Sequence, residues 1–86
     1  MCIRDSLEEA EKSQRKAIEL KPDFANAHHN LAVIFLKRST KADDKIKKLS
    51  FLDQAISEAK QSYALYPKDA YKETWDSIQS ILNTFQ

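Results

Sequence analysis

Glycine is absent from this 86-residue sequence, and proline occurs only at Pro22 and Pro67. Glycine-rich phosphate loops and dinucleotide-binding turns need backbone approaches that a side chain obstructs, so both enzyme classes are excluded for this chain. The scarcity of helix breakers, together with plentiful alanine, leucine, lysine and glutamate, predicts an all-α fold. A chain of this length forms at most one domain with a modest core.

Long apolar runs are missing too, and there is a single cysteine. No stretch is long and apolar enough to span a membrane, and we expect no membrane contact. Cys2 lies in the opening string MCIRDS, which resembles the translated end of a transposon adapter used in sequencing libraries. We interpret residues 1–6 as a non-native leader, expect residues 7–86 to be a fragment of a longer protein, and infer no redox compartment from Cys2. The cytoplasm is favoured, although the sequence does not decide the compartment.

Apolar residues recur at helical spacing on both sides of Pro22. Proline disfavours helical geometry in the residue before it and tolerates a first helical turn after it, so a turn between two helices is predicted here. Asp43 or Asp44 would cap a later helix, in which a break near Ser50 is the alternative. The periodicity predicts four helices, over residues 6–21 or 7–21, 23–38 or 24–38, 44–66 and 70–84.

The phrase AIELKPDFANAHHNLA, over residues 17–32, resembles the helix-to-helix junction of the tetratricopeptide repeat. That family repeats an antiparallel helix pair every 34 residues and closes each repeat with a proline. Pro22 and Pro67 lie 45 residues apart, 11 more than the period. We therefore expect an insertion that lengthens both arms of the second hairpin. The family prefers other residue types, tryptophan, glycine or an aromatic residue, at four positions: His28, Ala32, Gln14 and Ala59.

The resemblance assigns the predicted helices to parts of an α-solenoid. Residues 7–22 would be the second half of one repeat, residues 23–67 a repeat with the insertion, and residues 68–86 a capping helix. A single apolar stripe in the last helix, from Tyr71 to Phe85, is typical of such a cap. The residues expected to pack between the helices are Ala10, Ala17, Leu20, Pro22, His28, Leu31, Ala32, Phe35, Ala55, Ala59, Pro67, Trp75, Ile78 and Leu82.

In this family the first helix of each repeat lines a concave groove that binds peptides. The resemblance implies a non-catalytic scaffold for a protein or peptide partner, with groove residues Asn26, His29, Asn30, Val33 and Lys37. Only Asn30 matches the asparagine of a carboxylate clamp. The alternative is an accessory region of a larger bacterial enzyme, because similar repeats are attached to glycosyltransferase, sulfotransferase and oxygenase domains. Self-association through the first helix is also expected, because its upstream partner helix would be missing.

The residues offer little for chemistry. His28 and His29 point about 100° apart on a helix, and no other metal-ligand type lies three or four positions from either. The acids, Glu58 among them, are interpreted as helix-surface charge. We therefore expect no catalytic residue, metal or cofactor.

The sequence also predicts a basic hairpin end. Six basic and two acidic residues lie between Lys37 and Lys48. We interpret this basic tip as solvated, and nucleic-acid binding is not expected, because stacking aromatics and a wider basic surface are lacking.

Overall fold

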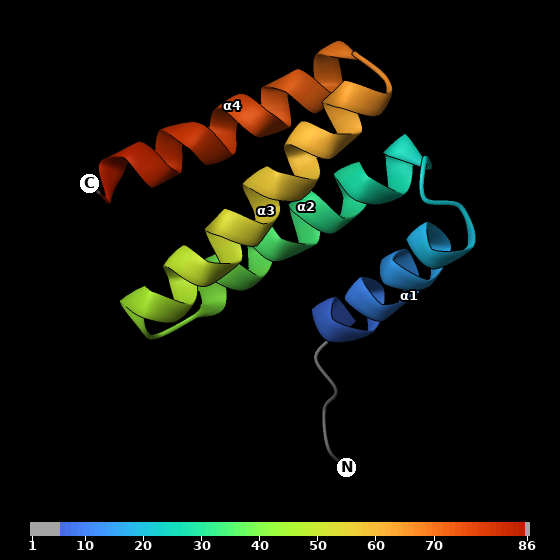
Figure 1. The fold of residues 1–86 in the computed structure, drawn as a ribbon. Helices are drawn as coiled ribbons and strands as arrows, with labels where there is room; N and C mark the ends of the chain where they lie inside the picture. Colours follow the sequence, from blue (N-terminus) through green and yellow to red (C-terminus); the bar gives the residue numbers. More distant parts are fainter. Residues whose placement is uncertain (1–5, 86) are drawn as a thin grey trace.

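A computed structural model describes residues 6–85 as four α-helices, with no strand among those residues (Figure 1). The helices are α1 (Ser6–Leu20), α2 (Ala25–Lys41), α3 (Lys45–Leu65) and α4 (Asp69–Thr84). The all-α prediction is therefore confirmed. None of these helices is long and apolar enough to cross a membrane. Apart from Ser6, which begins α1, the interpreted leader with Cys2 lies outside the described residues.

The predicted helix boundaries agree closely, and the largest difference is at the end of α2. The turn expected from Ser39 onward begins only at Ala42, because Ser39 and Thr40 remain helical. The Ser39 hydroxyl donates a hydrogen bond to the Leu36 carbonyl at 2.5 Å, and the Thr40 hydroxyl donates to the Lys37 carbonyl at 2.7 Å. A short hydroxyl side chain can bond to a carbonyl of the preceding turn without leaving the helix. A short connection is left between α2 and α3.

The third helix is continuous, so the alternative of a break near Ser50 is wrong. Asp44 is its N-cap and accepts a hydrogen bond from the Ile46 amide at 3.0 Å. This bond satisfies one of the free amide groups at the helix start. With 21 residues at a rise of 1.5 Å each, α3 is roughly 30 Å long. The stretch between the two prolines therefore consists almost entirely of two helices.

Each helix packs on the next one along the chain and runs antiparallel to it (Figure 1). The hairpin of α2 and α3 is central. On one side α1 packs on α2, and on the other α4 packs on α3 and, over a shorter stretch, on α2. Principal extents of 37 × 34 × 16 Å show that the four helices form a thin array rather than a rounded bundle.

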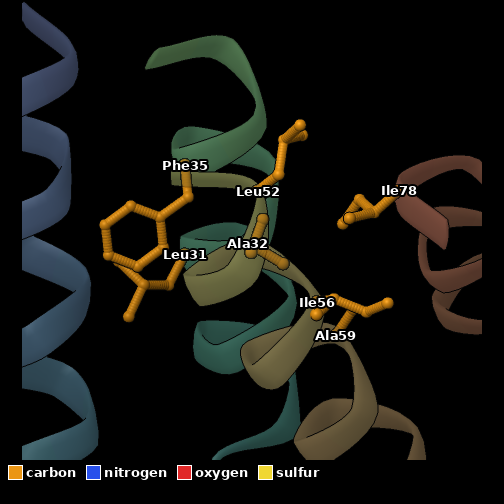
Figure 2. Close-up of a cluster of buried hydrophobic side chains, with 8 residues drawn as sticks. Leu31, Ala32, Phe35, Leu52, Ile56, Ala59 and Ile78 are labelled. Carbon is orange, nitrogen blue, oxygen red and sulfur yellow. The ribbon is translucent and has the colours of Figure 1, made fainter. Parts of the chain in front are cut away.

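The core is centred on the facing sides of α2 and α3. Ala32, Ala55 and Ala59 are fully buried there, and their small side chains allow the two helix backbones to approach closely. Figure 2 shows Phe35 and Leu31 on the side of the core toward α1, and Ile78 entering from α4. The buried apolar cluster comprises Leu31, Ala32, Phe35, Leu52, Ala55, Ile56, Ala59 and Ile78.

Most residues expected to pack between helices are covered. Seven of them are buried: His28, Leu31, Ala32, Phe35, Ala55, Ala59 and Ile78. Four are half-buried: Ala10, Ala17, Trp75 and Leu82. Leu20 differs, because it is 74% exposed. It follows the half-buried Ile18 by two positions, about 200° around the helix, and so points away from α2. Pro22 and Pro67 are exposed as well, because they interrupt helices rather than fill the core.

The same substitution at a buried and an exposed leucine tests this core. Leu52 is 1% exposed, and Leu52→Ala should lower the free energy of unfolding by about 2–5 kcal/mol because it leaves a cavity. Leu20→Ala is the matched control and should change it by less than about 0.5 kcal/mol. Urea unfolding followed by far-UV circular dichroism measures both. Equal losses at the two positions would contradict this core.

Candidate partner-binding surface

The five candidate groove residues lie along one side of α2. Asn26, Asn30, Val33 and Lys37 follow one another at spacings of four, three and four, and His29 lies beside this line. Asn26 and Lys37 are exposed, and the other three are half-buried. Of the other α2 residues before its last turn, Ala25 and Leu36 are half-buried and the rest are buried. We call the five candidate residues the α2 strip, and it contains the two exposed residues that α2 has before its last turn.

His29 lies at the junction of α2 with α4 rather than in an open groove. Its ring packs on Tyr71, with centroids 4.7 Å apart, and the Lys68 ammonium lies 5.7 Å from the centroid of the same tyrosine. Burial lowers the pKa of His29, and the charge of Lys68 lowers it further. Its Nδ1 is buried and has no hydrogen-bond partner within residues 6–85. Both effects favour the neutral imidazole over the charged form.

His28 has a different role, because both of its ring nitrogens face acceptors. Nδ1 lies 2.6 Å from Glu58 Oε1 on α3, and Nε2 lies 2.9 Å from the Pro22 carbonyl oxygen. A carboxylate and a carbonyl both accept, so the ring makes both hydrogen bonds when each nitrogen carries a proton. His28 is 7% exposed, and it joins α3 to the turn before α2.

This contact corrects the interpretation of Glu58 as helix-surface charge. Glu58 is half-buried and paired with a residue 30 positions earlier. No spacing within α2 or α3 could have indicated the pair. It depends on the register of one helix against the other, which periodicity alone does not supply.

Arg38 is the second correction, because its charge is already paired inside the fold. Its Nη1 donates to Glu11 Oε1 at 2.5 Å, and its Nη2 lies 4.0 Å from Glu8 Oε2. The guanidinium also lies over the Phe51 ring, 4.9 Å from the centroid. Arg15 donates to the other oxygen of Glu11 at 2.8 Å. Arg38 therefore links α1, α2 and α3, and it does not belong to a free basic tip.

Three surface depressions lie away from the α2 strip. One is at the end of the α2–α3 hairpin, a second lies along α3, and a third is lined by residues of α1, α2 and α3, among them Ile18, Leu31 and Glu58. None of the three includes a strip residue. Within the described residues, no group of three or more His, Cys, Asp and Glu side chains could hold a metal ion.

Comparison of the chain with protein-family models, curated proteins and solved structures finds no match. The structure itself therefore defines the class: an all-α chain of four antiparallel helices around one long central hairpin. Any functional conclusion must come from the surfaces that this hairpin presents.

Removing the Glu58 carboxylate should destabilise the fold. Glu58→Ala leaves a buried histidine nitrogen without its acceptor, and we expect a loss of about 1–3 kcal/mol in the free energy of unfolding. Glu73→Ala makes the same change on the exposed side of α4 and should alter it by less than about 0.5 kcal/mol. Urea titrations at pH 7 compare the two. A loss that is no larger for Glu58→Ala would show that the His28 contact contributes nothing.

The lowered pKa of His29 predicts a pH dependence. Below about pH 6.5 the unfolded chain binds a proton at this residue before the folded chain does, so the free energy of unfolding should fall as the pH decreases. His29→Gln should remove the part of the pH dependence of the free energy of unfolding that His29 contributes. His28 is present in both proteins, so the comparison isolates His29. Proton NMR titration of the His29 ring measures the pKa directly. A midpoint at or above the ordinary histidine value would contradict the burial against Tyr71.

Proposed function

We propose that this chain is a non-catalytic protein-interaction module of the tetratricopeptide type, which binds an extended segment of a partner protein along the α2 strip. The observation that carries the proposal is the strip itself. A helix packed by α1, α3 and α4 is held rigidly, and one side of it stays accessible. Binding groups on such a rigid element need little ordering when a partner arrives.

The order of packing supports a repeat arrangement. In this proposal α1 is the second helix of one repeat, and α2 and α3 form the next repeat. The last helix, α4, is a cap that contacts both α2 and α3. The apolar side of α4 faces the hairpin through Tyr71 and Ile78, and Trp75 packs on Tyr63 of α3 with ring centroids 5.9 Å apart. The outward side is polar, as a terminal helix requires, and carries Lys72, Glu73, Asp76, Gln79, Ser80 and Asn83.

The side chains of the strip are suited to a peptide. The amides of Asn26 and Asn30 each offer donors and an acceptor, and neither makes a side-chain hydrogen bond to another described residue. Asn30 is half-buried, so an uncommitted amide there favours a partner that supplies the missing bonds. Val33 offers a small apolar contact, and Lys37 can meet an acidic side chain. Strip contacts of this kind bind a main chain without requiring one sequence.

Peptides selected from a random phage-displayed library against the whole chain test the proposal. We expect binders whose Kd rises at least about tenfold, or about 1.4 kcal/mol, when Asn26 and Asn30 are both changed to Ala. The control changes Gln54 and Gln61, two exposed amides on the outer side of α3, to Ala and should leave the Kd within about twofold. Fluorescence anisotropy measures each Kd. Binders that are equally sensitive to both pairs, or a library that yields none, would contradict binding along the strip.

A further inference from the structure

The end of the α2–α3 hairpin has a free basic surface, which we call the hairpin tip and define as Lys41, Lys45, Ile46, Lys47 and Lys48. Three of its lysines are exposed and Lys48 is half-buried. Arg38 is paired with α1, but none of these four lysines forms an ion pair with a carboxylate within residues 6–85. The tip lies at one end of the hairpin, away from the α3–α4 connection (Figure 1).

The helix dipole accounts for Lys41, which lies in the last turn of α2, but not for the other three lysines. Three lysines, Lys45, Lys47 and Lys48, lie at the start of α3. The first turn of this helix contains no acidic residue. The helix dipole favours negative side chains at this end and disfavours cations there. The carboxylates of Asp44, which caps the helix, and of Asp43 before it oppose this. A sequence that breaks a local rule without a structural gain is often serving a binding role.

Two further features give the tip the character of a docking surface. Ile46 is 75% exposed in the middle of the lysines, although its aliphatic side chain would gain free energy from burial. The same end of the hairpin carries a depression of about 330 Å³, comparable in volume to small ligand pockets, and Ile46 is not one of its lining residues. The depression has Phe51 and Ala42 among its apolar residues and Lys41 and Lys47 among its basic ones.

We propose that the hairpin tip binds a partner protein through a segment that combines acidic and apolar side chains. The acids would pair with the lysines, while apolar side chains of the segment would cover Ile46 and enter the depression over Phe51. This interaction uses no residue of the α2 strip, so it stands or falls separately from the proposed function.

The acids at the tip favour a protein over other polyanions. Asp43 and Asp44 are exposed between the lysines and also line the depression. A phosphate backbone or an anionic membrane presents nearly uniform negative charge and would meet these carboxylates with repulsion. A protein segment can instead place a main-chain amide against each one. Nucleic acid also offers little aliphatic surface to cover Ile46, and a flat bilayer does not fill a depression.

The test measures binding of the whole chain to a fluorescein-labelled peptide of about a dozen residues, built from Glu, Asp, Leu and Phe, by anisotropy at low salt, where charge pairs are least screened. Changing Lys45, Lys47 and Lys48 together to Gln should raise the Kd at least about tenfold, or about 1.4 kcal/mol. Changing Lys12, Lys16 and Lys72 to Gln alters the net charge equally at other exposed sites, and should raise the Kd less than about twofold. Ile46→Ser should raise it about threefold.

The outcomes separate the two surfaces and the two kinds of partner. Changing Asn26 and Asn30 to Ala should leave this peptide's Kd unchanged, and a loss there would overturn the assignment to the tip. Absence of saturable binding at low salt, or equal losses in the two lysine triples, would overturn the proposal. The proposal would also be overturned if oligouridine, or phosphatidylcholine–phosphatidylserine vesicles, bound more tightly than the peptide and did so through Lys45, Lys47 and Lys48. That result would assign the tip to a polyanion.

Discussion

The close packing of α2 against α3 is the constraint on which the rest of the structure depends. Ala32, Ala55 and Ala59 have no exposed surface, and a larger side chain at any of them would push the two backbones apart. This central hairpin then receives α1 on one side, near Phe35, and α4 on the other, through Ile78 (Figure 2). The outer helices attach to the hairpin and not to each other, so α2, packed on several sides, is the most rigid support for a binding surface.

Two polar contacts fix how the helices meet along their lengths. His28 and Glu58 set α2 against α3 near the Pro22 turn, whereas Arg38 ties α1 to the far end of α2 and covers Phe51. Apolar contacts alone tolerate sliding of one helix along another, but a partly buried hydrogen-bonded pair loses its contact when the helices slide. The two contacts lie near opposite ends of α2. They therefore add specificity of register to the burial that stabilises the hairpin.

Periodicity and the two prolines are enough to predict the four helices, and Asp44 is correctly among the expected caps. The same periodicity places the five strip residues along one side of α2. What the sequence could not supply is contact between helices: Glu58 against His28, and Tyr71 against His29, are pairs about 30 or more positions apart. The predicted end of α2 was also wrong, because Ser39 and Thr40 were assigned to the following turn. The sequence alone does not distinguish a Ser or Thr whose hydroxyl bonds to its own helix from one that begins a loop.

The most direct measurement is a methyl NOESY spectrum of the labelled protein, because the packing of α4 on the α2–α3 hairpin is what defines the array. Cross-peaks from the Ile78 methyl groups to the buried alanine methyl groups of α2 or α3 are the result expected from the structure. If the chain is helical by circular dichroism but Ile78 shows no such cross-peak, the helices do not assemble around the hairpin. The α2 strip and the hairpin tip would then not be presented as described.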